Sequence, residues 1–168
     1  MYIADTFMDL SEAYPFSGPH PHFSPDGEYV AVVVEYRILV REVDTLRVVQ
    51  LYSCLDKIQS YQWSPDSKYI LCVLKGRPIV QIWSLEEPDW TCKIDEGPAG
   101  ITSARWCPDA RSIFLTADFQ IKATIWSLVD RKCVYIKGPK FSDKAIDFDK
   151  DGEKLVLAEV GLECLCFE

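Results

Sequence analysis

Residues and motifs that carry catalysis are scarce in this chain of 168 residues, which contains only two histidines. The sequence has no P-loop, no Gly-x-Gly-x-x-Gly pattern, no Gly-x-Ser-x-Gly elbow and no His-Glu pair at zinc spacing. His20 and His22 stand in a proline-rich stretch, and two ligands without a third do not make a typical metal site. We therefore predict no enzyme activity, no cofactor, no metal and no small-molecule substrate.

Long apolar runs and clusters of basic residues are missing as well. The longest apolar runs, such as 30–34, fall far short of the ~20 residues of a membrane helix, and acids stand at the amino terminus where a signal peptide is basic. The net charge of −8 opposes binding to nucleic acid, because phosphate contacts depend on clustered lysine and arginine. These absences predict a cytoplasmic protein with no membrane and no nucleic-acid partner.

Cysteine is present seven times, an odd number that includes no Cys-x-x-Cys pair. Most of the cysteines lie inside or beside strand-like runs, and Cys164 and Cys166 alternate along one such run and so share a face. This pattern indicates buried thiols in a reducing compartment and argues against a disulfide framework.

One short pattern recurs four times, as FSPDGEYVAVVV, WSPDSKYILCVL, WCPDARSIFLTA and FDKDGEKLVLAE. The copies begin at Phe23, Trp63, Trp106 and Phe148, so the intervals are 40, 43 and 42 residues, a period typical of four-stranded propeller blades. Twenty residues after the first three starts come Val43, Trp83 and Trp126, which we take as equivalent positions. The second strand of each unit is almost continuously apolar, as expected for a sheet buried on both faces between neighbouring blades.

These repeats predict an all-β propeller segment of three full blades and a partial fourth that together form an open arc. Residues 1–22 are expected to supply an amino-terminal strand and a proline-rich segment, followed by blades at 23–52, 57–95, 100–137 and 144–168. Four tryptophans, Trp63, Trp83, Trp106 and Trp126, are predicted to anchor the blades. Ser67 and Ala110 replace the turn glycines of the other two units, so their hairpins are expected to be weaker.

Two IWSL stretches, at 82–85 and 125–128, resemble the Trp-Asp of WD repeats, although Ser84 and Ser127 replace the aspartate and no Gly-His dipeptide occurs. The stretches LYSCLDKIQSYQWSPDSKYILC and VQIWSLEEPDWTCKIDEGPAG resemble a WD-repeat family of centrosomal and spindle-pole proteins, whose founding gene lies antisense to the p-seventy-three gene. The resemblance implies a noncatalytic scaffold in microtubule anchoring, spindle assembly and ciliogenesis. It also implies two partners, a coiled-coil microtubule-anchoring protein and a minus-end-directed kinesin. Chains of that family are far longer, so an amino-terminal fragment is expected.

Two other functions stay open. Propellers of translation-factor or other ribonucleoprotein assemblies also use Ser-Pro-Asp-Gly turns, and some peptidases carry a gating propeller. The net negative charge disfavours a role in a ribonucleoprotein assembly, and the absence of a nucleophile motif disfavours a peptidase.

The loop charges differ between the two predicted ends of the blades. Loops that join second to third strands, and one blade to the next, carry eight basic against six acidic side chains, whereas the opposite loops carry five against twelve. The first set of loops is therefore predicted to bind an acidic protein, with residues 75–78 as the main contact. The candidate contact residues are Arg37, Lys75, Arg77, Lys122 and Lys140 on those loops, together with Trp90 at the start of an outer strand.

Overall fold

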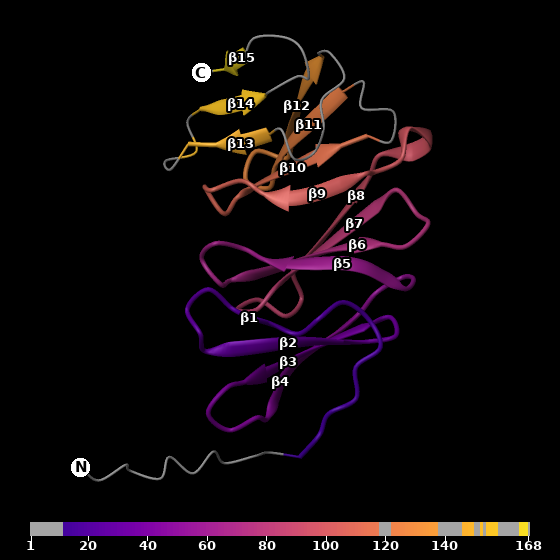
Figure 1. Cartoon of the computed structure of the whole chain (residues 1–168), viewed down its shortest axis with the longest axis vertical. Coiled ribbons are helices and arrows are strands. Elements are labelled where there is room, and N and C mark those ends of the chain that lie inside the picture. The colour runs from indigo at the N-terminus through magenta and orange to yellow at the C-terminus, as the bar shows by residue number, and fades with distance from the viewer. Residues whose placement is uncertain are drawn as a thin grey trace, which may run out of the picture.

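The computed structural model describes residues 12–117, 122–137, 146–149, 152, 154–157 and 165–167, which form four antiparallel sheets stacked along the long axis of the molecule (Figure 1). The first three sheets have four strands each, and the fourth has three described strands. In chain order the strands are β1 (His22–Phe23), β2 (Tyr29–Val34), β3 (Arg37–Glu42) and β4 (Val48–Ser53); β5 (Ile58–Trp63), β6 (Tyr69–Leu74), β7 (Ile79–Ser84) and β8 (Thr91–Asp95); β9 (Ser103–Trp106), β10 (Ser112–Thr116), β11 (Lys122–Ser127) and β12 (Lys132–Lys137); and β13 (Ile146–Phe148), β14 (Leu155–Leu157) and β15 (Leu165–Phe167).

Each sheet runs through its strands in sequence order, as a meander in which every strand pairs with the next. The first and fourth sheets lie at opposite ends of the stack, so the described residues form an open arc (Figure 1). The only helical element in the described ranges is the short 3-10 turn η1 (Gly97–Ala99), and no helix there has the length and apolar character needed to cross a membrane.

The hydrophobic core consists of three layers, one between each pair of neighbouring sheets. Strand β6 shows how one strand serves two layers, because Ile70, Cys72 and Leu74 face the first sheet while Leu71 and Val73 face the third. All five side chains are buried, which explains the continuous apolar run in this strand. Burying one such aliphatic side chain contributes about 1.5–3 kcal/mol, so each sheet depends on its neighbours for stability.

The anchor tryptophans occupy these layers, with one difference at the first blade. Trp63, Trp83 and Trp106 are buried, and Trp126 is half-buried. Phe23, the counterpart of Trp63, is 66% exposed, because it lies on the face of the first sheet that points away from the second. The buried tryptophans also bond across the layers, since the Trp106 indole N–H donates to the Gln62 carbonyl of the neighbouring sheet at 3.3 Å.

The predicted equivalence of Val43 with Trp83 and Trp126 is wrong. In the sheet register Arg41 takes the place of these two tryptophans, and Val43 lies beyond the end of β3. The cause is the turn between β2 and β3, which has two residues where the turn between β6 and β7 has four. A fixed spacing from the start of the repeat therefore overshoots by two residues in the first blade.

Serines organise the hairpin turns and the turns after the tryptophans. In the second hairpin the Ser64 hydroxyl accepts a hydrogen bond from the Tyr69 amide at 2.9 Å and donates to Asp66 at 2.6 Å. The Ser84 hydroxyl accepts a hydrogen bond from the Glu87 amide at 3.0 Å, and the Ser127 hydroxyl accepts the equivalent bond from the Asp130 amide at 3.1 Å. The serines that stand in place of the WD aspartate thus close the turns that lead to β8 and β12.

The fourth residue of each hairpin turn has a left-handed backbone whether or not it is glycine. Ser67 has φ of 63° and Ala110 has φ of 55°, against 79° for Gly27. Ser67 also gains a contact, because its hydroxyl accepts a hydrogen bond from the Asp26 amide of the neighbouring hairpin at 3.0 Å. The backbone strain that the sequence predicts for this turn is therefore accompanied by a bond between blades.

Gly27 offers a clean measure of this backbone requirement, because no heavy atom lies within 4 Å of the position that a Cβ would take. We expect Gly27→Ala to lower the free energy of unfolding by about 1–2 kcal/mol, since the whole effect comes from the left-handed φ. Gly27→Asn, whose side chain tolerates this conformation better, should lose clearly less in the same denaturant titration. Equal losses for both variants would contradict the backbone explanation.

Candidate protein-interaction surfaces

The loops that were predicted to bind a partner form one continuous surface, which we call the first loop face: residues 35–37, 54–57, 75–78 and 95–102. Backbone hydrogen bonds join these loops in order, from the Cys54 amide to the Tyr36 carbonyl (2.8 Å), from Lys75 to Lys57 (2.8 Å) and from Glu96 to Pro78 (3.0 Å). Each bond continues the strand pairing of one sheet, and residues 54–57 connect the first sheet to the second, so main-chain bonds give the face a fixed shape.

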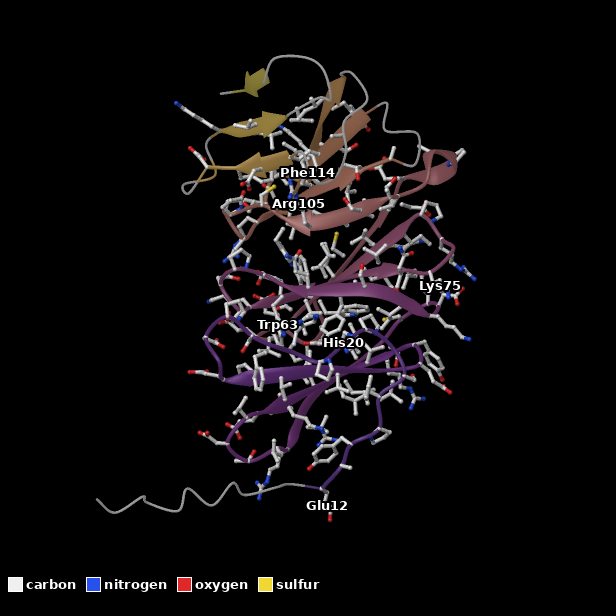
Figure 2. All side chains as sticks on the ribbon, viewed as in Figure 1. Glu12, His20, Trp63, Lys75, Arg105 and Phe114 are labelled. Atoms are coloured by element: carbon white, nitrogen blue, oxygen red, sulfur yellow. The ribbon has the colours of Figure 1, made fainter. Side chains whose placement is uncertain are left out.

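Three of the predicted contact residues belong to this face. Arg37 and Lys75 are exposed, and Lys75 projects from the side of the stack (Figure 2). Arg77 is already engaged, because its Nε lies 2.8 Å from a carboxylate oxygen of Asp56. The Lys57 amide and the Arg77 guanidinium together hold the pKa of Asp56 below its ordinary value. Lys57, which the sequence reasoning counted but did not single out, stands beside Lys75 through the backbone bond between them.

A cleft of 410 Å³ opens on the first loop face between the second and third sheets. Its lining is Gln59, Leu74, Gly76, Arg77, Pro78, Gly100, Ile101 and Thr102. Residues 76–78 of the predicted contact stretch therefore form part of the wall of this cleft.

The charge balance of the first loop face is even among the described residues. Four basic residues are balanced by four acidic ones: the basic residues are Arg37, Lys57, Lys75 and Arg77, and the acidic residues are Glu35, Asp56, Asp95 and Glu96. The positive excess expected from the sequence rests on other residues: the side chain of Lys122, at the start of β11, and the whole of Lys140 lie outside what the structure describes. Lys57 and Lys75 are two exposed basic residues that lie next to each other on this face, since the Lys75 amide donates to the Lys57 carbonyl.

The opposite loops remain strongly acidic and are cross-linked between blades. Asp66 in the second hairpin lies 2.6 Å from the Arg111 guanidinium in the third, and Arg111 also stacks over the Tyr69 ring at 5.1 Å. Partial burial tends to raise the pKa of Asp66, but the bonds from Ser64 and Arg111 outweigh it and hold that pKa below its ordinary value. We regard the Asp66–Arg111 ion pair as structural because it joins the second hairpin to the third.

Trp90 lies apart from the first loop face. Trp90 directly precedes the outer strand β8. Its ring is half-buried and meets the Tyr69 ring edge-on at a centroid distance of 5.3 Å. With Thr91, Cys92, Lys93 and Ile94 it lines a groove of 440 Å³ at the outer rim, whose other wall is Trp126, Ser127, Leu128 and Arg131. The sequence reasoning singled out Trp90 but missed this groove.

The backbone carbonyls of the two histidines accept hydrogen bonds from the second sheet, and the His22 ring meets the Tyr61 ring edge-on at 5.3 Å. The carbonyl of His20 lies 2.8 Å from the Tyr61 hydroxyl, and the carbonyl of His22 accepts a hydrogen bond from the Trp63 indole at 3.2 Å. Burial raises the pKa of Tyr61 to about 12, so this phenol keeps its proton and continues to donate over the physiological pH range. Within the described ranges no group of three or more histidine, cysteine or carboxylate side chains could hold a metal ion.

The described cysteines are all free thiols, of which Cys54, Cys72 and Cys107 are buried. The sulfurs of Cys54 and Cys72 lie 3.7 Å apart, too far for a disulfide bond. Cys164 lies outside the described residues, and the side chain of Cys166 in β15 is not described.

Comparison with known proteins finds a relative in sequence and likenesses among solved structures. No known family profile matches the chain. The mouse WD repeat-containing protein WRAP73 is 49% identical over 152 residues, which are 90% of this chain, and the chain spans only 33% of that protein. This similarity confirms the family resemblance that the repeat stretches indicated.

Among solved structures, the Myceliophteria thermophila Cps50 (Swd1) β-propeller domain superposes with a TM-score of 0.67 at 17% identity, over 86% of this chain and 50% of that one. Kuenenia stuttgartiensis hydrazine synthase superposes with a TM-score of 0.63 at 16% identity, over 96% of this chain and 47% of that one. At these identities the likeness concerns the fold alone. Together with the four sheets it confirms the predicted all-β propeller segment.

Proposed function

Because this chain belongs to the WD-repeat family of WRAP73, we propose that it is a noncatalytic protein-interaction scaffold acting at the centrosome and spindle pole. The observation that carries the proposal is the 49% identity to that relative across 90% of the chain, on a propeller whose loops are bonded into continuous faces. In this role the protein anchors microtubules and supports spindle assembly and ciliogenesis. Its partners are a coiled-coil microtubule-anchoring protein and a minus-end-directed kinesin.

The first loop face is the docking surface in this proposal. Its loops are fixed by main-chain bonds, so binding there costs little ordering of the protein. Lys57 and Lys75 offer adjacent exposed cations beside the 410 Å³ cleft, and an acidic stretch of the anchoring protein would meet them without displacing the Arg77–Asp56 ion pair. A complex of this kind gains its specificity and association rate mainly from charge complementarity.

Reversing this basic pair tests the docking surface. We expect Lys57→Glu/Lys75→Glu to weaken binding of the coiled-coil anchoring protein by roughly tenfold or more in a quantitative pull-down, because two attractive contacts become repulsive. The matched control is Arg47→Glu/Lys132→Glu, which makes the same change of charge at two exposed positions at the opposite end of the blades, one in the turn between β3 and β4 and one at the start of β12. Retained binding by the first variant, or equal loss by both, would remove the face assignment.

The cellular role has its own test. The chain carrying a fluorescent tag should concentrate at spindle poles in dividing cells, and the Lys57→Glu/Lys75→Glu variant should lose that enrichment while the control variant keeps it. Even distribution of the unaltered chain, in cells where its anchoring partner is present at the poles, would refute the centrosomal role.

A further inference from the structure

The two layers flanking the second sheet differ at one equivalent position. Tyr52 in β4 and Ile94 in β8 occupy the same place in their blades, as do Trp83 and Trp126 in the sheets that follow. Tyr52 stacks on Trp83 with ring centroids 5.3 Å apart and leaves it 7% exposed. Ile94 is smaller and carries no ring, so Trp126 stays half-buried and a hollow remains beside it. The groove at the outer rim therefore results from a tyrosine-to-isoleucine difference between repeats.

The lining of this rim groove shows that it follows the edge of a strand. Side chains alternate between the two faces of a sheet, yet residues 90–94 all contribute to the groove in succession. Successive residues contribute in this way where a hollow follows the edge of a strand, and among the described strands β8 is the last of its sheet and pairs with β7 alone. Alternate backbone N–H and C=O groups of such an edge have no partner in the sheet and are available to an added strand.

The opposite wall adds apolar surface and positive charge. Trp126 and Leu128 provide the apolar part, and the cations are Arg131 on this wall and Lys93 on β8, while no carboxylate belongs to the lining. Burial raises the pKa of the Cys92 thiol and the Arg131 charge opposes that rise, which is consistent with a guanidinium directed toward the groove. Lys93 is only loosely held, with its Nζ 3.7 Å from an Asp95 oxygen and both side chains about half exposed.

The walls are also rigid enough to bind without rearrangement. The Trp90 ring rests on Tyr69, which in turn contacts Trp106 at a centroid distance of 6.0 Å inside the core. On the other side the Trp126 indole N–H donates to Glu96 at 2.9 Å. Fixed aromatic walls of this kind carry much of the binding energy in protein interfaces, because little side-chain freedom is lost on binding.

We propose that the rim groove binds an extended, alternating apolar and acidic segment of a partner protein, which adds a strand to the edge of β8 and places an apolar side chain over Trp126. The apolar side chain fills the space that corresponds to that of Tyr52 in the layer between the first and second sheets. The acidic side chains lie on the other face of the added strand and pair with Lys93, while Arg131 adds to the positive charge of the lining. Main-chain bonds to β8 supply sequence-independent affinity, and the groove selects the side chains.

This site is separate from the first loop face and does not depend on a spindle-pole role. Its failure and that of the proposed function are therefore distinguishable, because Lys57→Glu/Lys75→Glu leaves the rim groove unchanged and the groove variants leave that basic pair unchanged. A second copy of this chain, pairing edge to edge along β8, is the competing occupant.

The probe is an acetylated peptide of about nine residues that alternates valine with glutamate, titrated into the 15N-labelled chain. We expect the indole N–H resonances of Trp90 and Trp126, assigned with Trp→Phe variants, to shift together and saturably, while that of Trp63 stays in place. A peptide alternating valine with lysine should bind at least tenfold more weakly, because the lining is cationic. A proline in the middle of the acidic peptide should abolish binding, because it removes a strand donor.

Two protein variants locate the site. Ile94→Tyr should abolish binding by filling the groove as Tyr52 does, and Arg131→Glu should weaken it roughly tenfold without altering the core. Arg47→Glu, the matched charge reversal in the turn between β3 and β4, should bind like the unaltered chain.

Equal binding of the basic peptide, or no indole shift at millimolar acidic peptide, would overturn the proposal. A concentration-dependent dimer of the unaltered chain that disappears in Ile94→Tyr would also overturn it, in favour of a second copy as the occupant.

Discussion

Replacing Trp63 with alanine is expected to lower the free energy of unfolding by about 3–5 kcal/mol, the cost of deleting a large buried aromatic side chain. Trp63 is 6% exposed and lies in the layer between the first and second sheets, where its indole donates to the His22 carbonyl at 3.2 Å (Figure 2). Its ring stacks on Tyr29 of the first sheet at a centroid distance of 6.4 Å. The substitution removes apolar contact and an inter-sheet hydrogen bond together.

Trp63→Phe separates these contributions. Phenylalanine keeps most of the buried ring but cannot donate to the His22 carbonyl, so the loss should fall to about 1–2 kcal/mol in the same denaturant titration. A loss below about 1 kcal/mol for Trp63→Ala would mean that this layer contributes little to stability, and it would contradict the account of sheets that depend on their neighbours.

The repeat itself could be predicted from the sequence because the physics behind it is local. Turn residues recur at fixed offsets, an aromatic residue ends each first strand, and the apolar second strand follows directly. These features indicate the order of strands and the pairing of each strand with the next, whereas the irregularity between Ile58 and Ser60 in the pairing of β5 with β6 was not predicted.

Features that depend on turn length or on two distant segments could not be predicted in this way. A turn shorter by two residues moves Arg41 into the position of a tryptophan, and the only sign of it in the sequence is a spacing that differs between blades. The pairing of Arg77 with Asp56 joins loops 21 residues apart, so loop charges counted singly overstate the free positive charge. The rim groove is visible only when Tyr52 and Ile94 are aligned as outer-strand positions, where the repeat is least regular.

Phe114 holds the fourth sheet to the third. Its side chain is fully buried, and its ring meets that of Phe148 edge-on at a centroid distance of 5.7 Å. The Arg105 guanidinium lies 5.3 Å from the Phe114 ring and 5.5 Å from the Phe148 ring, and it donates to the Ile146 carbonyl at 2.8 Å. Figure 2 shows Arg105 and Phe114 near each other in this upper part of the stack. Phe114 is therefore a central member of the layer between these two sheets, which also includes Ile146 and Leu155.

Phe114→Ala is accordingly expected to have a local as well as a global effect. The free energy of unfolding should fall by about 3–5 kcal/mol. Because each sheet contacts only its neighbours, the fourth sheet should open first, with amide exchange in β13 and β14 approaching that of an unfolded chain while β6 and β7 keep their protection.

Phe114→Leu preserves most of the buried volume and removes only the ring contacts with Arg105 and Phe148, so its loss should stay below about 2 kcal/mol and β13 should keep measurable protection. Equal loss of protection in all four sheets on Phe114→Ala would contradict nearest-neighbour stability and show that the arc opens as one unit. Retained protection in β13 would instead show that the fourth sheet is held by contacts other than this ring cluster, and the Arg105 bond to the Ile146 carbonyl is the one to remove next.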